Sequence, residues 1–232
     1  MQQVVCRSTI INILISCFVC AIMVGFSITF LDREIATWSH NYLNGIQMFV
    51  WFTWIIEPIP YLAVGGLAAF IILLLFGWRP GPLGSKILSF CLAVLVAIAI
   101  KEQLKFYFGR TWPETWTNDN PSWIDNGIFT FQLFHGKDGW ASFPSGHTTT
   151  IAASMSVLWR IIPKFRLLWG CLFVLVAIGL LGANYHWLSD IITGGFLGTA
   201  CGFGMTTLLC QDKSIIHLNS TKILGKSSNN DT

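Results

Sequence analysis

The chain has 232 residues, of which 53% are hydrophobic and 11% are charged, with a formal net charge of +3. Soluble domains carry about 25% charged residues, and a soluble surface needs charge roughly in proportion to its area. This composition excludes an ordinary soluble domain, a disordered chain and a nucleic-acid-binding protein with a basic surface. It predicts an all-α, polytopic membrane helix bundle, with room for about six transmembrane helices of about 20 residues.

The N-terminal part alternates between apolar and polar stretches. Residues 10–31 are apolar over a length that exceeds the core of a secretory signal, so we expect a membrane helix there. Residues 32–44 are polar. Residues 45–56 are apolar and aromatic but too short to span, and they are predicted to lie along the membrane interface, which tryptophan favours. Pro58 and Pro60 end that run.

The rest of the chain predicts five further helices and one long loop. The helices are expected at residues 61–78, 87–108, 148–162, 167–183 and 187–209. The loop, residues 109–144, is rich in Trp, Asn, Asp, Gly and Pro. Residues 1–210 are therefore predicted to form a single transmembrane domain with its core motifs within 101–190, followed by a polar cytoplasmic tail at 211–232.

The basic residues predict the orientation, because cytoplasmic loops are enriched in Lys and Arg. With a cytoplasmic N-terminus, nine of the fourteen basic residues fall on the cytoplasmic side: Arg7, Arg79, Lys86, Arg160, Lys164, Arg166, Lys213, Lys222 and Lys226. The loop at 109–144 then lies outside the cytoplasm, together with the outer ends of the helices.

Three polar motifs fall at those outer helix ends, in chain order Lys105 with Arg110, then Pro144–His147, then His186 with Asp190. Because the three ends share one face of the membrane, their side chains can converge on one pocket. Ser145 and Gly146 precede a helix whose free N–H groups can bind an anion. The serine can cap that helix or bond a phosphate oxygen, and glycine permits close backbone approach.

The remaining groups fit the chemistry of phosphate transfer. His186 and Asp190 are spaced i, i+4 and share a helix face, so the carboxylate can orient the imidazole and leave its other nitrogen free as nucleophile or base. Lys105 and Arg110 are cations at the same depth, suited to holding a phosphate while charge moves to its leaving oxygen.

Each motif alone has a structural alternative. Lys105 can snorkel to the interface, Arg110 can anchor a helix there, the Pro-Ser-Gly-His run can be a turn, and the histidine–aspartate pair can be a structural hydrogen bond. Their combination on one face favours a phosphate site. Of the other histidines, His135 could border that site, whereas His40 and His217 are interpreted as loop and tail.

The three motifs resemble those of the type 2 phosphatidic acid phosphatase superfamily, namely Lys-x6-Arg-Pro, Pro-Ser-Gly-His and Ser-Arg-x5-His-x3-Asp. The resemblance covers roughly residues 60–205 and is complete in the second motif. The first and third motifs match at Lys105, Pro113, His186 and Asp190.

The resemblance implies an integral-membrane lipid phosphatase that needs no metal and no cofactor. His186 would form a phosphohistidine, Asp190 would orient it, and His147 would protonate the leaving oxygen. The phosphate would be held by Lys105, Ser145 and the Gly146 backbone.

Two positions depart from the family pattern. Its two arginines fall on Trp112 and Leu180 in this chain, and Arg110 is predicted to supply a missing guanidinium from a shifted position. The departures also leave open an inactive member of the family.

A pocket at the outer leaflet predicts a lipid phosphate or diphosphate as substrate and partner, and no nucleic acid. The candidates are a polyprenyl diphosphate, phosphatidylglycerol phosphate, phosphatidic acid or a lipid A-type glycolipid. The loop at 109–144 could act as a lid or recognise the head group. Two alternatives remain, a lipid phosphotransferase that uses the same phosphohistidine, and a channel, transporter or scaffold. The six-helix form favours a bacterial inner membrane with the site facing the periplasm or exterior.

Overall fold

The structure is a computed structural model that describes residues 2–116, 119–136 and 139–210. In those ranges it is helical, and backbone pairing outside helices is limited to isolated bridges in the long loop. The predicted tail at 211–232 lies outside the described residues. The helices are α1 (Gln2–Phe26), α2 (Asp32–Leu43), α3 (Gln47–Thr53), α4 (Pro58–Leu75), α5 (Pro82–Phe108), α6 (Trp123–Asn126), α7 (Gly146–Ile161), α8 (Arg166–Gly182) and α9 (Leu188–Leu209). The all-α prediction is confirmed.

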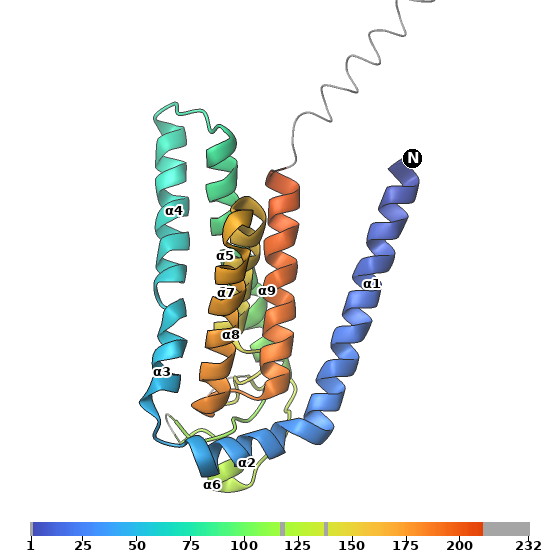
Figure 1. Cartoon of the computed structure of the whole chain (residues 1–232), viewed down its shortest axis with the longest axis vertical. Helices are drawn as coiled ribbons and strands as arrows, with labels where there is room; N and C mark the ends of the chain where they lie inside the picture. Colours follow the sequence, from blue (N-terminus) through green and yellow to red (C-terminus); the bar gives the residue numbers. More distant parts are fainter. Residues whose placement is uncertain (1, 117–118, 137–138, 211–232) are drawn as a thin grey trace, which may run out of the picture.

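Five stretches of the described residues are long and apolar enough to cross a membrane. They are Ile10–Leu43, Gln47–Leu75, Pro82–Phe108, Pro163–Gly182 and Leu188–Leu209. The sixth predicted segment corresponds to α7, which has 16 residues and lies at the centre of the bundle against α5, α8 and α9. The expected set of about six helices thus consists of five long stretches and a shorter, buried helix, and α1 stands apart from the others and contacts α9 (Figure 1).

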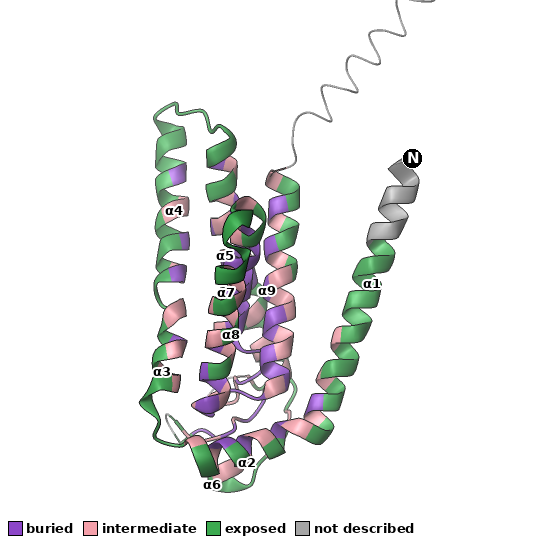
Figure 2. Cartoon of the chain, viewed as in Figure 1, coloured by how far each residue is buried: buried purple, intermediate pink, exposed green. Residues whose placement is uncertain are grey.

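The core lies along α7. Ile151, Ala153 and Val157 are completely buried there, and the hydrophobic cluster that contains Ile151 and Ala153 extends to Val94 of α5 and Val176 of α8. Figure 2 shows the buried residues on the inner faces of the helices and the exposed ones on the outer faces. The outer faces carry many exposed Leu, Ile and Phe side chains. Such a belt is stable against lipid and not against water.

One sequence-based prediction about an element is wrong. Residues 45–56 do not lie along the interface, because α3 continues lengthwise into α4 within the single apolar stretch Gln47–Leu75 and packs against α8. Pro58 does not break this run since it is the first residue of α4, where its missing N–H costs nothing. The element that crosses the end of the bundle is α2, which the polar residues after position 31 form (Figure 1).

Figure 1 also shows which helix ends lie together. The N-terminus of α1, the α4–α5 turn and the C-terminal end of α9 lie at one end of the bundle, and α2 and α6 lie at the other. The loop at 109–144 includes α6 and belongs to this second end. All three chemical motifs therefore lie at the end of the bundle that α2 crosses, as the alternation of helix directions requires.

Candidate active site

Gly109 directs the chain from α5 into the site. It is the C-terminal cap of α5, has φ of +40°, and donates its N–H to the Lys105 carbonyl at 3.1 Å. A Cβ at this position would lie 2.1 Å from the Gln132 carbonyl oxygen. Both the left-handed conformation and the crowding require glycine. The sharp turn sends the next residue, Arg110, into the interior, where its exposure is 0%.

His186 and Asp190 form the pair that their spacing predicts. His186 lies in the turn between α8 and α9, is 4% exposed, and has its Nδ1 3.3 Å from Asp190 Oδ2. Asp190, in the first turn of α9, also accepts a hydrogen bond from the Ser142 hydroxyl and one from the Trp187 backbone N–H. These contacts fix the carboxylate and hence the orientation of the imidazole.

Arg110 binds the same carboxylate from the other side. Its Nη1 donates to Asp190 Oδ1 and to Ser189 Oγ, the latter at 2.7 Å. Its Nη2 donates to Asp32 Oδ2 at 2.7 Å. The guanidinium also stacks on the rings of Phe129, Phe131 and Trp187.

Asp32 is a member of this network that sequence reasoning missed. It is the first residue of α2, 1% exposed, and its Oδ1 accepts from Ser27 Oγ at 2.8 Å and from the Ser189 N–H at 3.0 Å. Asp32, Arg110 and Asp190 therefore form one buried chain of charges that ends at His186. No local pattern pairs Asp32 with a residue 78 positions later.

A pocket of about 660 Å³ opens beside His186. We call it the histidine pocket; its polar lining consists of Lys101, Lys105, Thr150, His147 and His186, with Gly146 between them. Ile56, Pro60 and Ile98 form an apolar wall. The rings of His147 and His186 are arranged edge to face with centroids 6.1 Å apart. A group bound between them would contact both imidazoles.

The two lysines lie one helical turn apart on α5. Lys105 Nζ donates to the Ala141 carbonyl at 2.6 Å and lies 5.5 Å from the Trp112 ring centroid. Lys101 pairs with Glu102, and its Nζ lies 3.2 Å from where a Cβ on Gly146 would be. Sequence reasoning missed Lys101 as a site residue, although its i, i+4 spacing from Lys105 places both on one helix face.

Two of the predicted phosphate ligands lie elsewhere. Ser145 is fully buried and accepts the Thr148 N–H as N-cap of α7, and it does not line the histidine pocket. Arg110 does not line it either, because its guanidinium is held between two carboxylates. The predicted direct contact of Arg110 with phosphate does not fit this geometry, because the turn at Gly109 directs the side chain inward.

The two positions that depart from the family pattern have different surroundings. Trp112 lines the histidine pocket with its ring 5.0 Å from that of His186, and its Nε1 has no hydrogen-bond partner among the described residues. Leu180 is completely buried in the hydrophobic core. At position 112 an indole N–H therefore stands where the family has a guanidinium. At position 180 an apolar side chain packed in the core takes that place.

The site shifts the pKa values of its two histidines downward. Burial lowers the pKa of His186 below 6.5, and the opposing attraction of Asp190 does not cancel that effect. Burial, with the nearby His186, Lys105 and Lys101, lowers the pKa of His147 to about 3. Before substrate binds, both imidazoles are neutral at pH 7, so the nitrogen of His186 that faces the pocket carries a free lone pair.

The other sequence-predicted positions have separate surroundings. His135 is exposed against Trp140 and does not line the histidine pocket. His40 pairs with Glu114 in a second pocket, described below, and His217 lies outside the described residues. Within the described ranges, no three His, Cys, Asp or Glu side chains gather as metal ligands would.

Comparison with known proteins decides the family. The sequence pattern of the PAP2 superfamily matches residues 86–213, which is more than half of the chain. The chain belongs to the PAP2 superfamily. The match contains all three motifs, whereas Asp32 and the rest of α2 precede it. With its apolar helices, this PAP2 chain is an integral membrane protein.

The relatives of this PAP2 chain include proteins named as phosphatases. It is 31% identical over 70 residues to proteins named lipid A 1-phosphatase from Rhizobium johnstonii and Rhizobium etli. That stretch is 30% of this chain and 29% and 30% of theirs, so the chain spans less than a third of the length of these curated relatives.

Two solved structures are also similar. LpxE of Aquifex aeolicus is 21% identical, with a TM-score of 0.48 over 76% of this chain and 95% of the other. A PAP2-type phosphatidylglycerolphosphate phosphatase of Bacillus subtilis is 18% identical, with a TM-score of 0.46 over 84% and 92%.

Proposed function

We propose that the protein is a phosphatase that hydrolyses the phosphate monoester or diphosphate of a lipid through a phosphohistidine on His186, without a metal ion. The observation that carries this proposal is the buried His186–Asp190 pair at 3.3 Å, opening on a pocket that also holds His147 and two lysines. A base oriented by a carboxylate beside cations is the arrangement that nucleophilic attack on a phosphate requires.

In the first step the free nitrogen of His186 attacks phosphorus, and the bond from phosphorus to the lipid oxygen breaks. The departing oxygen takes a proton from His147. Asp190 accepts the Nδ1–H of His186 and stabilises the positive charge that the imidazole acquires. Lys101, Lys105 and the first N–H groups of α7 bind the phosphate oxygens as charge develops. In the second step His147 takes a proton from water, which displaces phosphate from His186.

The proposed acid role of His147 depends on the substrate. Its pKa of about 3 leaves it neutral in the free protein. A bound phosphate brings up to two negative charges next to the ring and reverses the effect of the lysines, so the pKa of His147 rises on binding. Protonation of His147 is thereby coupled to the presence of a phosphate.

Arg110 is proposed to be a positioning residue instead of a phosphate ligand. It binds Asp190 on the face opposite His186 and is itself bound by Asp32. The network fixes the carboxylate that orients the nucleophile, and its own charges are satisfied by serine hydroxyls and by backbone N–H groups.

The apolar wall of the histidine pocket supports a lipid as the substrate. The apolar wall of Ile56, Pro60 and Ile98 lies on helices that face lipid, so an acyl or prenyl chain can stay in the membrane while its phosphate reaches His186. We further propose that residues 1–210 act as one domain and that the site faces the periplasm or exterior of a bacterial inner membrane. Transfer of the phosphate to a second lipid instead of water is the alternative outcome of the same first step.

The test is hydrolysis of a panel of lipid phosphates by purified protein, with release of inorganic phosphate as the readout. His186→Ala is expected to reduce kcat by at least about 1,000-fold, since removal of a nucleophile eliminates the covalent route. His135→Ala removes an exposed histidine and should retain normal activity. Hydrolysis by His186→Ala at the normal rate would refute the nucleophile assignment. Phosphate found only on an acceptor lipid would establish the transferase.

A further inference from the structure

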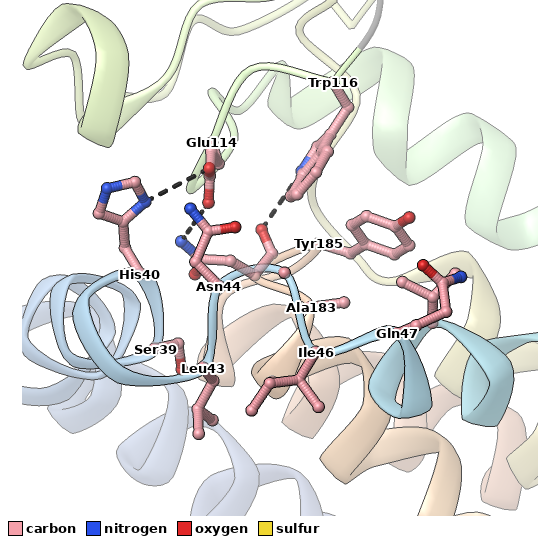
Figure 3. A pocket seen from close by; sticks show the side chains of 14 residues that line it. Ser39, His40, Leu43, Asn44, Ile46, Gln47, Glu114, Trp116, Ala183 and Tyr185 are labelled. Carbon is pink, nitrogen blue, oxygen red and sulfur yellow. Dashed lines mark hydrogen bonds and ion pairs between the residues drawn. The ribbon is translucent and has the colours of Figure 1, made fainter.

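A second pocket, of about 310 Å³, lies next to the histidine pocket (Figure 3). We call it the α2 pocket because its floor is the turn from α2 to α3, with Asn44 on that turn and Gln47 at the start of α3. Glu114 and Trp116 of the long loop form one wall, and the residues that follow α8 form the other. The α2–α3 part of this lining precedes the family match.

The walls of the α2 pocket are fixed by their own polar contacts. Glu114 Oε1 lies 3.3 Å from His40 Nδ1, and Glu114 Oε2 accepts a hydrogen bond from Asn184 Nδ2 at 3.0 Å. The Asn184 carbonyl accepts the Trp116 Nε1–H at 3.3 Å. Figure 3 shows His40, Glu114 and Trp116 around the cavity. A site preorganised in this way loses little entropy on binding.

The free polar groups define the ligand chemistry. Asn44 and Gln47 are exposed, and their amides have no hydrogen-bond partner among the described residues. An amide donates and accepts, as a hydroxyl does. The Glu114 carboxylate disfavours an anion, so phosphate prefers the neighbouring pocket with its lysines. Because both oxygens of Glu114 already have partners, a cation is favoured less than a neutral hydroxyl group.

The two pockets share a wall. Trp116 and Tyr185 line both, and their rings meet edge to face with centroids 4.6 Å apart. Tyr185 directly precedes His186, so the backbone of the proposed nucleophile continues into the α2 pocket. A head group that extends from a phosphate on His186 past Trp116 and Tyr185 would enter the α2 pocket.

We propose that the α2 pocket binds a neutral, hydroxyl-rich part of the substrate head group, such as a sugar or polyol, while the phosphate occupies the histidine pocket. This inference rests on the proposed phosphatase function and specifies its substrate. The aromatic faces of Trp116 and Tyr185 give a sugar ring its apolar contact, and Glu114 with the two amides gives it hydrogen bonds. Specificity then comes from the loop and α2, outside the three family motifs.

The experiment compares two substrates with acyl chains of equal length, an acylated sugar 1-phosphate and phosphatidic acid, whose only polar head is the phosphate. Glu114→Gln and Asn44→Ala are each expected to raise KM for the sugar phosphate about tenfold, the loss of one good hydrogen bond. Their KM for phosphatidic acid should stay within about twofold of wild type. Glu34→Gln, an exposed carboxylate on α2 outside the pocket, serves as the matched control.

Equal changes for both substrates, or no change for either, would overturn the inference while leaving the phosphatase intact. A loss confined to an amine-bearing lipid phosphate would assign the pocket to a cation and overturn it too. If wild type hydrolyses neither lipid, the proposed function fails, and binding decides the inference. The phosphate-free acylated sugar should then raise the Tm of wild type but not of Glu114→Gln, and equal shifts in both proteins would reject the site.

Discussion

At the scale of residues, the site depends on a buried charge network that carries one net negative charge. Asp32 and Asp190 each pair with Arg110, and none of the three side chains is accessible to solvent. Removing charges from water costs several kcal/mol per ion. The cost is offset here because nearly every oxygen also accepts from a hydroxyl or a backbone N–H. Arg110 Nε alone has no hydrogen-bond partner among the described residues.

Substitutions at Asp32 and at Arg110 should shift the pH dependence of activity in opposite directions. Asp32→Asn leaves the Arg110 charge to Asp190 alone, which weakens the pull of Asp190 on a protonated His186 and lowers the pKa of that imidazole further. The acid limb of kcat/KM against pH reports the free protein, in which burial lowers the pKa of His186 below 6.5, and this limb should move to lower pH. Arg110→Gln removes the cation and should move the limb to higher pH.

The free energy of unfolding is a second quantity that tests this network. Arg110→Gln leaves two buried carboxylates without their partner, at an expected cost of about 3–5 kcal/mol in unfolding free energy, so Arg110→Lys is the milder variant to measure alongside it. Glu34→Gln, exposed on the same helix as Asp32, should change neither limb nor Tm. If the acid limbs of Asp32→Asn and Arg110→Gln moved in the same direction, the positioning role of Arg110 would be contradicted.

The same residues show what spacing can and cannot predict. Motif spacing fixes which helix end and which face a residue occupies, and His147, His186 and Lys105 line one pocket, with Asp190 against His186. Arg110 lies between two carboxylates instead of in that pocket, and nothing in its sequence position reports the left-handed turn that directs it inward. Asp32 had no partner signal, because long-range contacts depend on how α2 crosses the bundle.

At the scale of elements, the contact between α7 and α9 positions the two histidines relative to one another. Glycines of α9 let the helices approach so closely that a Cβ on Gly198 would lie 2.3 Å from the Thr149 carbonyl oxygen. Small residues of this kind give membrane helices their packing, since lipid supplies no hydrophobic drive between them. His147 begins one of these helices and His186 precedes the other.

Gly198→Ala should therefore destabilise the protein by about 1–3 kcal/mol, the usual cost of overpacking a filled interface. Gly204→Ala on the same helix is the matched control, because its Cβ would meet nothing within 4 Å. Alanine there should be neutral or gain up to about 1 kcal/mol through helix propensity. Thermal unfolding in detergent measures both. Equal Tm values for the two variants would mean that α7 and α9 are not closely packed.

At the scale of the whole molecule, composition predicted a helical membrane bundle, and the motifs predicted that its chemistry gathers at one end. What composition could not predict was which polar stretch would become a helix. Residues 32–44 have too few apolar side chains to resemble a membrane element, yet α2 closes the end of the bundle and contributes Asp32 to one pocket network and His40 to the other. Its structure is determined by tertiary contacts.

The distribution of charge over the whole molecule also predicts its orientation. The α4–α5 turn carries Arg79, and Lys86 lies near the start of α5. Positive residues favour the cytoplasm, so the opposite end, with α2 and the histidine pocket, should face outward. A membrane-impermeant thiol reagent should label Gln132→Cys in intact cells and should label Gly81→Cys only after the cells are opened. Both positions are exposed, and a Cβ on Gly81 meets nothing within 4 Å, so both variants should fold.

The unsubstituted chain gives the background from its native cysteines, which lie in helices apart from Cys210 at the end of α9. Labelling in the reverse pattern would put the histidine pocket at the cytoplasmic leaflet. Hydrolysis would then act on lipid phosphates as they are made instead of after they have crossed the membrane. Orientation therefore decides which pool of lipid the proposed phosphatase can reach, independently of the chemistry at His186.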